Sequence, residues 1–540
     1  MADIEWYCKR LEEAKARRSN WDTIFQEIAD RVLPQAADFN SRREDGASRT
    51  ELMFDATASL SAAKFAAVME SFNSPRNSQW HKLTVSDRSL AKQQRVKAWL
   101  DEATAILFDA RYSPRAGFAG QSGEVYLNLG VFGTAGLFID ADLAQRTLRY
   151  KTLSLANTWF MENMHGRIDT VFREFRWTLR QIEQRWPGQM PQKLAEKLEK
   201  KPDERACVVH VTSPATDYEP GAMNYRGKPF RSCYFLPDEK HKLEEGGFTS
   251  WPFPCARYMT SVDEVYGRSP AWLALSSIKV LNEQKKTVLK AGHRAVDPPL
   301  LASEDGILSA FNMQPGAINY GGIDSQGRPT VQPLMTGTRV DIGKDLMDDE
   351  RRIISEGFLI DLFKVLAENP TMTATQAMEL VQERASLLSP IGGRLQSEWF
   401  GPQIEREVDL LQQAGQLPPL PPELIEANGE YEIEYTSPMA RAARASEGVA
   451  IIRSLEAITP LAQVDPGILD GIKLDEIPAE LWEINGAPIK LLRTPEELAA
   501  MREGKAQQEQ AAQLLAAAPV VSETATNLVN LQKSYGTPVQ

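Results

Sequence analysis

The sequence predicts an α+β fold that is mainly α-helical. Long segments repeat apolar residues at helical spacing, whereas a central block, residues 205–260, has short strand-like runs separated by proline and glycine. Two further helical segments flank an insert rich in proline and glycine. The chain has 540 residues, 42% of them hydrophobic and 25% charged, which is the composition of a folded protein with room for about two to four domains.

The N-terminal third has five segments with a clear pattern. Helices are expected over residues 3–33, 54–72, 90–110 and 169–186, and a β-hairpin within residues 123–150. In the first helix Trp21, Phe25 and Val32 recur at helical spacing. Pro34 ends that helix, because the residue before a proline avoids the helical conformation.

Two long helices enclose the insert. The first runs from Pro270 to about Arg294, and the second runs from about Asp341 to Ala367. At about 1.5 Å per residue each helix spans roughly 35–40 Å. The first has an apolar stripe of Leu275, Ile278, Leu281, Val288 and Leu289, and the second has one broad apolar face of Leu346, Ile353, Ile354, Phe358, Leu362, Phe363 and Leu366. The pattern predicts a stalk that carries a small β-rich head, residues 296–337.

The C-terminal part is again mainly helical. Thr373 and Gln376 fit a capping box for a helix that ends near Leu388, and Gly392-Gly393 is interpreted as a hinge. Further helices are expected over residues 395–415, 440–458 and 466–485, a short strand over 430–436, and a Gln/Ala-rich helix after Thr494.

The charge argues against a protein that grips DNA tightly. The net charge is −12, whereas DNA-clasping proteins are usually basic because they neutralise phosphates. A pore through which DNA slides stays compatible with an acidic chain. The charged N-terminus predicts no secretory signal, and the lack of a long apolar run predicts no membrane helix. Four cysteines in a chain of this length are expected to be reduced thiols in a cytoplasmic setting.

Each candidate motif for catalysis, phosphate binding or metal binding is better explained by a structural role. The glycines of GVFGTAGLF (130, 133 and 136) lack the GK[ST] ending of a phosphate loop and fit a turn with close packing. Cys207 and His210 form only one loose pair, so a zinc site is not expected. The acidic pairs Asp348-Asp349, Glu244-Glu245 and Asp140/Asp142 have no third carboxylate from a recognisable motif. We therefore expect no enzyme activity, metal or cofactor.

The first long helix carries a basic series. Its members are Lys279, Lys285, Lys286, Lys290, His293 and Arg294. They are candidates to line a passage for DNA. A solvated face, or a face between subunits, is the more ordinary explanation of such a series.

Several segments taken together resemble a known family, the head-to-tail connecting (portal) proteins of short-tailed bacteriophages. The segments are WDTIFQEIADRVLP, ELMFDATASLSAAKFAAVMESFNSPRNSQWHKL, NLGVFGTAGLFID, GRIDTVFREFRWTLRQIEQRW, GRSPAWLALSSIKVLNEQKKTVLKAGHRAVDPPLL, DDERRIISEGFLIDLF, TATQAMELVQER and YTSPMARAAR. No single motif is diagnostic, but their order and spacing are specific over roughly residues 5–505.

The resemblance implies a portal-like ring subunit with an α+β wing, a two-helix stem, a small β-rich clip and a helical crown. The implied parts are an N-terminal wing (1–268), the first stem helix (269–295), the clip (296–338), the second stem helix (339–367), a tunnel-loop region with wing helices (368–440), C-terminal wing and crown helices (441–505), and a Gln/Ala-rich helix and tail (506–540). The tunnel loop would lie near residues 368–375 or 386–394.

The resemblance also implies a function and partners. The chain would form a homo-oligomer, commonly a dodecamer, at one capsid vertex of the virion after assembly in the host cytoplasm. Double-stranded DNA would pass through the ring, which would contact the terminase large subunit, the major capsid and scaffolding proteins, and later a tail adaptor protein; no membrane is involved. The alternatives are another DNA-associated ring adaptor or a metal-dependent DNA-processing enzyme.

Candidate contact residues follow from this assignment. The channel or DNA-facing candidates are Lys285, Lys286, Lys290, Arg294, Arg384 and Arg394. The clip candidates for contact with terminase or tail are Asp297, Glu304, Asp305, Asn312, Asp324 and Arg328.

Overall fold

The structure is a computed structural model, and its described part covers most of the chain. The described residues are 2–40, 46, 50–87, 90, 93–142, 145–302, 312, 314–320, 322–323, 326–334, 340–360, 390–426, 431–462, 472–473, 477–478, 481, 501 and 504. The chain divides into two compact units, Met1–Ala443 and Arg444–Gln540. Helix α15 (Pro438–Ala462) begins in the first unit and continues into the second.

Four helices of the N-terminal third build much of the main core. They are α1 (Ala2–Val32), α2 (Thr57–Asn73), α4 (Gln94–Tyr112) and α5 (Phe118–Phe132), with a short 3-10 turn η1 (Pro34–Ala36) after α1. The predicted end of the first helix before Pro34 is confirmed. The hairpin predicted within residues 123–150 is confirmed as β2 (Thr134–Asp142) and β3 (Thr147–Thr152). Helix α5, which overlaps the first part of that segment, was not predicted.

Glycines explain why α5 was missed. Gly117 and Gly133 flank the helix in the left-handed conformation, with φ of 71° and 74°. Gly130 lies inside α5, where a Cβ would come 2.7 Å from the ring of Phe65 on α2. A glycine at 130 therefore lets two helices approach closely, and in the sequence it resembles a turn residue.

Two antiparallel sheets follow. The five-stranded sheet has the order β4-β5-β6-β7-β8, and the three-stranded sheet has the order β3-β2-β9. Their bounds are β2 (Thr134–Asp142), β3 (Thr147–Thr152), β4 (Thr158–Glu162), β5 (Ile168–Thr178), β6 (Arg205–Pro214), β7 (Phe230–Leu236), β8 (His241–Phe248) and β9 (Cys255–Arg257). The predicted strand-rich block is confirmed.

The helix predicted over residues 169–186 is wrong over residues 169–178, slightly more than half of its length. Residues up to Thr178 form strand β5, paired with β4 and β6, and only α6 (Leu179–Arg185) is helical. Val171 and Phe175 are four residues apart, which mimics a helical period, but they belong to different packing clusters of the sheet. Thr178 then caps α6 through a capping box with Gln181.

Helices cover both faces of the five-stranded sheet. On one face, the start of α1 packs through Ile4, Tyr7 and Leu11 against a cluster that includes Phe172 and Val209. On the other face, α6 and α7 (Gln192–Lys200) form a separate cluster with Val208, Leu236 and Leu243. Neighbouring residues of β6 thus point into opposite layers, as a strand requires.

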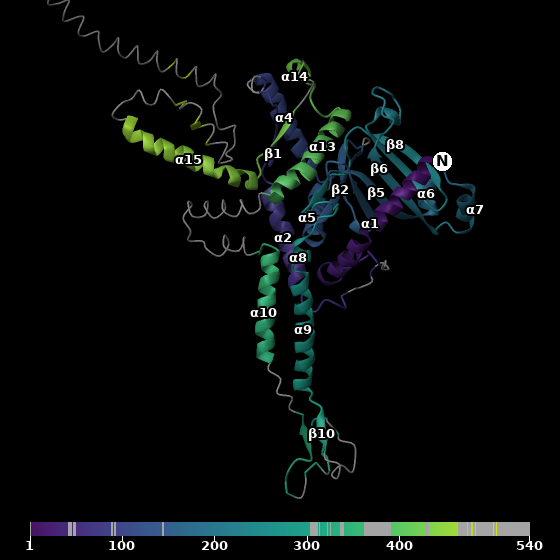
Figure 1. Ribbon diagram of the computed structural model, residues 1–540, viewed down its shortest axis with the longest axis vertical. Helices are drawn as coiled ribbons and strands as arrows, with labels where there is room; N and C mark the ends of the chain where they lie inside the picture. Colours follow the sequence, from purple (N-terminus) through teal and green to yellow (C-terminus); the bar gives the residue numbers. More distant parts are fainter. Residues whose placement is uncertain are drawn as a thin grey trace, which may run out of the picture. The chain divides into compact units, whose positions relative to one another are not determined.

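The second half of the first unit adds the long helices and closes the core. After β9 come α8 (Pro270–Leu273), α9 (Leu275–Val296), β10 (Leu300–Ala302), β11 (Val331–Pro333) and α10 (Val340–Gly357). A π-helical turn (Gln396–Phe400), α13 (Gly401–Gln413), α14 (Pro422–Glu426) and β12 (Glu432–Tyr435), which pairs with β1 (His81–Thr84), follow. We call the described residues of 2–268 and 390–437 the body. Helices α9 and α10 lie side by side and lead from the body to the β10–β11 ribbon (Figure 1).

Some predictions concern residues outside the described ones. The capping box at Thr373 and Gln376 and most of the 466–485 helix fall there. Gly392 and Gly393 are described and lie in a helical segment that runs into the π-helical turn, so their role as a hinge stays a prediction. The fold class, α+β and mainly α, is confirmed.

A buried ion pair joins two distant segments of the body. The Arg111 guanidinium on α4 donates from Nε to both carboxylate oxygens of Glu407 on α13, at 3.1 and 3.0 Å, and both side chains are fully buried. Tyr150 and Gln403 also donate to Glu407, at 2.8 Å each. Burial alone would lower the pKa of Arg111, but the pairing with Glu407 outweighs it and raises the pKa.

We predict that Glu407→Gln destabilises the body strongly. The substitution leaves the Arg111 charge buried without a counter-charge, which costs about 3–5 kcal/mol. Thermal unfolding followed by circular dichroism measures the effect. Lys197→Gln removes the exposed ion pair with Glu204 and serves as the control with an unchanged melting temperature. Equal melting temperatures for the two variants would contradict a structural role for the buried pair.

Candidate interaction site: the helix pair and the distal ribbon

Glycines set the spacing of α9 and α10. A Cβ at Gly343 would come 2.7 Å from Cγ2 of Val288, and a Cβ at Gly357 would come 3.3 Å from Cβ of Ala274. The earlier glycine, Gly343, meets the later residue, Val288, and the later glycine, Gly357, meets the earlier residue, Ala274. In each helical segment the two positions are about four turns apart. The helices are therefore antiparallel and in close contact over this length. We call α9 and α10 the helix pair, and the described residues from 300 to 334, which include β10 and β11, the distal ribbon.

A polar anchor fixes the helix pair to the body. The buried Asn282 of α9 accepts backbone N–H bonds from Phe54 and Asp55, at 2.7 and 3.0 Å, and donates to its own helix at Ile278 O. Arg351 of α10 donates to Asp55 at 2.7 Å. The segment before α2 thus holds both helices at once, and we call Asn282, Asp55 and Arg351 the polar anchor.

The surroundings of the Asp55 carboxylate lower its pKa. Burial opposes its ionisation, but hydrogen bonds from Thr57 and from Arg351 outweigh that cost, so the pKa lies below its ordinary value of 3.8. Asp55 is therefore charged at neutral pH, and its bond to Arg351 is charge-assisted.

Only part of the broad apolar face predicted for the second helix is buried. Ile354 and Phe358 are fully buried and belong to the main core. Leu346 and Ile353 are 50% and 46% exposed. They lie on a different side of α10 from Ile354, and the described residues cover only about half of each side chain. Leu362, Phe363 and Leu366 lie outside the described residues.

The predicted DNA-facing residues do not share one environment. Lys286 is half-buried, pairs with Glu283 at 3.4 Å and lies over the ring of Phe54, whereas Lys290 and Arg294 are exposed. Lys285 is half-buried on another side of α9. Arg394 donates to Thr260 and pairs with Glu398 at 3.7 Å within the body. Arg384 lies outside the described residues. That these residues contact DNA stays a prediction.

The distal ribbon is small and exposes apolar side chains. Strands β10 and β11 pair over three residues each, and Leu334 N donates to Pro299 O at 2.8 Å. The exposed large side chains here are Leu300, Leu301, Ile318, Tyr320, Ile323 and Leu334. A two-stranded ribbon is marginal on its own, so such a surface is typical of a contact region.

The predicted clip residues are only partly described. Asp297 is exposed at the end of α9, where its N–H bonds to His293 O. Asn312 is exposed and exchanges hydrogen bonds with Asn319, and Arg328 is exposed. Glu304, Asp305 and Asp324 lie outside the described residues. The contacts of this set with other proteins stay a prediction.

Arg257 is a central residue that the sequence did not single out. Its guanidinium is almost completely buried and forms a bidentate ion pair with Glu398. Nε and Nη2 of Arg257 each donate to one carboxylate oxygen of Glu398, at 2.8 Å. It also donates to Glu162 and to Gly166 O. The partners come from β4, the turn after it and the π-helical turn, so no local pattern could have revealed them.

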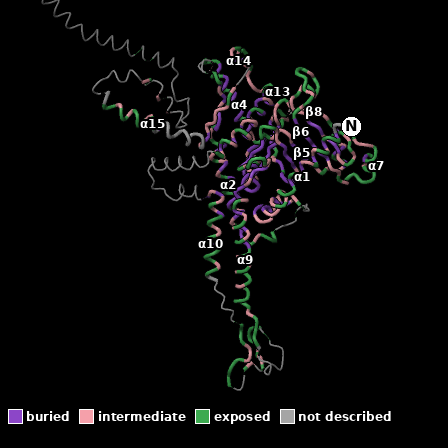
Figure 2. Tube along the Cα trace, in the orientation of Figure 1, coloured by how far each residue is buried: buried purple, intermediate pink, exposed green. Residues whose placement is uncertain are grey.

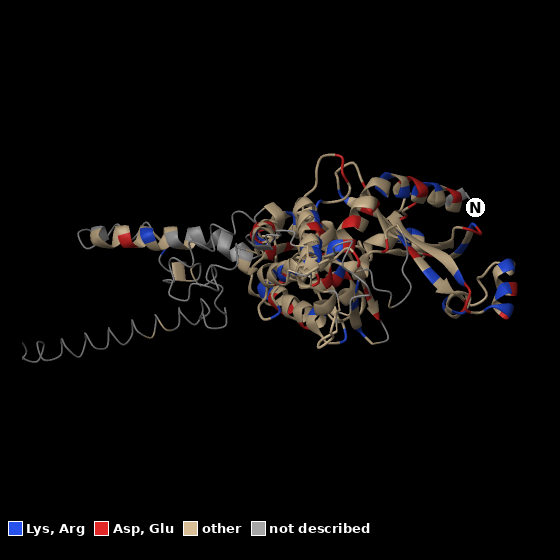
Figure 3. Cartoon of the chain, turned by 90° about the horizontal axis from the view of Figure 1, so that it is seen from below, with Lys and Arg blue, Asp and Glu red and all other residues tan. Residues whose placement is uncertain are grey.

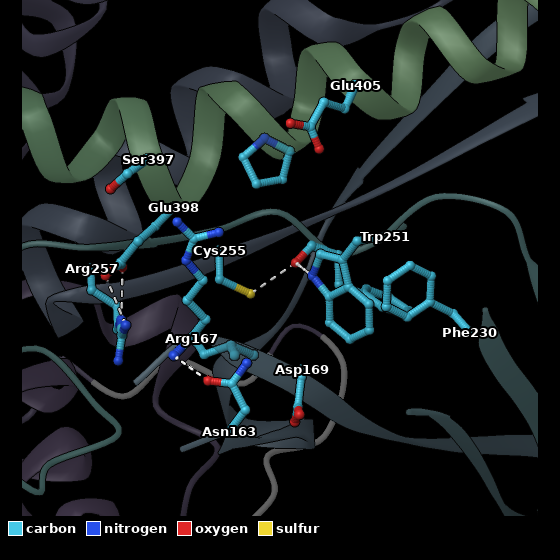
Figure 4. Close-up of a pocket in the computed structure, with 13 residues that line it drawn as sticks. Asn163, Arg167, Asp169, Phe230, Trp251, Cys255, Arg257, Ser397, Glu398 and Glu405 are labelled. Atoms are coloured by element: carbon cyan, nitrogen blue, oxygen red, sulfur yellow. Dashed lines mark hydrogen bonds and ion pairs between the residues drawn. The ribbon is translucent and has the colours of Figure 1, made fainter. Parts of the chain in front are cut away.

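A hollow of about 220 Å³ lies beside this network (Figure 4). Its walls carry Arg167, Asp169 and Glu405 next to the aromatic rings of Phe230 and Trp251. Burial raises the pKa of Glu405, which Arg167 offsets only in part, and burial also raises the pKa of Asp169. Among the described residues, no cluster of three or more His, Cys, Asp or Glu side chains is arranged to hold a metal ion.

The charges of the body are mixed. Basic and acidic residues are interspersed along the same elements (Figure 3). The buried residues are concentrated in the body, whereas the helix pair is exposed along much of its length (Figure 2). Within the part of the chain that the structure describes, no helix is both long and apolar enough for a membrane span.

Comparison with known proteins assigns the family. A family model described as bacteriophage head to tail connecting protein matches residues 6–492. The chain belongs to this family. The resemblance drawn from the sequence segments is thereby confirmed, and the chain is a connector between the head and the tail of a phage particle.

Two relatives match almost end to end. The "Probable portal protein" of Bordetella phage BPP-1 is 27% identical over 535 residues, which covers 97% of this chain and 95% of that protein. The "Portal protein" of Salmonella phage epsilon15 is 26% identical over 539 residues, with the same two coverages. A chain from the neck of an empty GTA particle matches at 11% identity and a TM-score of 0.30, over 65% of this chain and 80% of that one, which is too distant to establish a common fold.

We predict that alanine has opposite effects at two glycines of this connector's helix pair. Gly292→Ala meets no atom within 4 Å and should stabilise the helix by about 0.5–1 kcal/mol. Gly343→Ala gains the same helix propensity but collides with Val288, so its melting temperature should fall below that of Gly292→Ala. Val288→Ala in the Gly343→Ala background should restore it. Equal melting temperatures for both single variants would contradict the close contact.

A second prediction concerns the polar anchor. Asp55→Asn keeps the shape but loses the charge-assisted bond to Arg351, and should cost about 1–2 kcal/mol at pH 7. Because the pKa of Asp55 is lowered on folding, this contribution is present above pH 4 and is lost as the pH falls through the lowered pKa. Urea unfolding of both proteins from pH 7 to pH 3 measures the difference. A difference that does not shrink in acid would contradict the proposed charge on Asp55.

Proposed function

We propose that this connector is one subunit of a phage portal. Identical copies, about twelve by the resemblance, would form a ring at one capsid vertex around a channel for double-stranded DNA. The observation that carries this proposal is the helix–ribbon–helix unit, two long antiparallel helices with a small distal ribbon, in a chain of the head-to-tail connecting family. DNA would enter the head during packaging and leave it during ejection.

Each part of the chain has a role in this proposal. The body is the wing, α9 and α10 form the stem around the channel, and the distal ribbon is the clip. Residues 441–505 would form C-terminal wing and crown helices, and residues 506–540 a Gln/Ala-rich helix and tail. The clip would contact the terminase large subunit during packaging and the tail adaptor later, and the wing would contact the major capsid and scaffolding proteins. The exposed apolar side chains of the ribbon support a contact role for the clip.

The acidic net charge supports a channel that lets DNA slide. Each phosphate that a protein neutralises adds salt-dependent affinity, so a ring that binds many phosphates would slow translocation. We propose a mixed or acidic channel wall with only sparse rings of Lys or Arg. A ring structure with a continuous basic wall would contradict this. We also propose that the chain itself catalyses no reaction, which its lack of recognisable catalytic motifs supports.

Electron microscopy of the purified protein in negative stain tests the proposal. Rings with a central hole and about twelve-fold symmetry are the expected result. Monomers that cleave DNA in the presence of a divalent metal would overturn it in favour of a DNA-processing enzyme. Rings that lack a projecting stem would favour a different ring adaptor.

We predict that deletion of residues 300–335 separates assembly from packaging. Pro299 and Leu334 are joined by a hydrogen bond, so a short linker bridges the deletion without moving α9 or α10. Ring formation should persist, whereas DNA packaging in a reconstituted assay should be abolished. The control is the full-length ring measured beside it. Normal packaging by the deletion variant would show that the clip assignment is wrong.

A further inference from the structure

The exposed side of α10 has a regular composition. Ile342, Leu346 and Ile353 are 51%, 50% and 46% exposed, and their spacing places them along one side of the helix. An acidic residue follows each of them by three positions: Asp345, Asp349 and Glu356. We call these six residues the acidic side of α10. An apolar stripe edged by like charges is typical of a helix that packs against another helix.

Helix α9 has a matching side of opposite charge. Val280 is 43% exposed, and Thr287 and Ala291 follow it on the same side of the helix. Lys290 and Arg294 come three residues after Thr287 and Ala291. We call these five residues the basic side of α9. Along the whole helix, α9 has five Lys or Arg and one Glu, whereas α10 has six Asp or Glu and three Lys or Arg.

Among the described side chains of one copy, the charged groups of α9 and α10 pair with other partners and not with each other. The ion pairs of α9 lead to Glu27 of α1 and to its own Glu283, and those of α10 lead to Asp55 and to residues of α10 itself. Among the described side chains, no ion pair joins α9 to α10. Their contact is made instead through small and apolar residues such as Gly343 and Val288. Asp349 of the acidic side pairs with Arg352 of its own helix, but both side chains stay largely exposed, at 65% and 67%, so the charged sides can face another molecule.

We propose that the acidic side of α10 in one copy packs against the basic side of α9 in the next copy. This inference rests on the proposed ring. Two different surfaces of the same chain would meet at each interface. Such a heterologous interface can close into a ring. The exposed apolar stripe would be covered, and the rows of opposite charge would set the register and reject wrong pairings.

The proposal divides the basic residues of α9 by role. Lys290 and Arg294 would contact the neighbouring subunit rather than DNA. Lys285, five residues before Lys290, lies on another side of the helix and is left available to the channel. The basic character of α9 is then compatible with a channel that does not hold DNA tightly.

Charge reversal on each side separately, and on both together, tests the proposal. The variants of the full-length chain are Lys290→Glu/Arg294→Glu, Asp345→Lys/Asp349→Lys, and the combination of all four substitutions. Lys200→Glu/Lys201→Glu, on the exposed end of α7, is a matched control for the change in charge. Mass photometry and electron microscopy count rings against monomers, and circular dichroism checks that each variant is folded.

We expect each one-sided variant to lose rings by about tenfold or more at equal concentration, because like charges then face each other in every interface. The fourfold variant should regain rings, because the charges are again opposite, and the control should assemble like the natural chain. Salt should reduce the defect of the one-sided variants, since exposed charges are screened.

Two results would overturn the inference. The first is one-sided variants that form rings as well as the natural chain. The second is a folded fourfold variant that assembles no better than the one-sided variants. In both cases the natural chain would still form rings, so the portal proposal would stand. A natural chain that forms no rings would instead contradict the portal proposal itself.

Discussion

The helix pair depends on the bonds that Asp55 and Asn282 make at its base. Apolar contacts between α9 and α10 hold the helices together, but such contacts do not fix how far the pair extends from the body. Hydrogen bonds are directional, so Asn282 fixes α9 to the backbone at Phe54 and Asp55, and Arg351 fixes α10 to the same segment. The anchor also affects the distal ribbon, because β10 begins a few residues after the end of α9.

The body that carries the anchor is itself held together by buried charged groups. The segment that carries Asp55 leads into α2, whose Phe65 packs beneath Gly130 of α5. Helix α13 is joined to α4 by Glu407 and Arg111, and the π-helical turn before α13 is joined to β9 by Glu398 and Arg257. These bonds connect segments that lie far apart in the sequence. Their geometric demands oppose alternative packings that apolar residues alone would tolerate.

The sequence predicted the helices better than it predicted their surroundings. The first helix ends before Pro34 and α9 ends just before Asp297, because proline and capping signals act locally. Strand β5 was taken for a helix, since its apolar residues face two different layers and the resulting spacing resembles a helical one. The sequence also could not show that Leu346 and Ile353 are half-exposed whereas Ile354 and Phe358 are buried, because burial depends on which side of α10 faces the body.

In the candidate site, too, the sequence predicted local features but not the contacts between distant segments. Basic residues on the first long helix were recognisable from the sequence, but their different partners were not, because Glu27 and Phe54 come from remote segments. Arg257 was missed altogether, since nothing next to it in the sequence suggests that Glu162 and Glu398 would meet it. The periodicity of apolar residues predicts which residues are buried, but it does not predict which part of the chain packs against them.

The half-covered sides of the helix pair connect stability with assembly. Apart from the contact of Val288 with Gly343, α9 and α10 have few buried residues, and the two described strands of the ribbon pair over three residues each. Helices and ribbons of this kind are marginal unless packing adds to their stability. A neighbouring copy that covers Ile342, Leu346 and Ile353 would supply that packing, and binding to the folded form stabilises it by mass action. Order in the stem and closure of the ring would then reinforce each other.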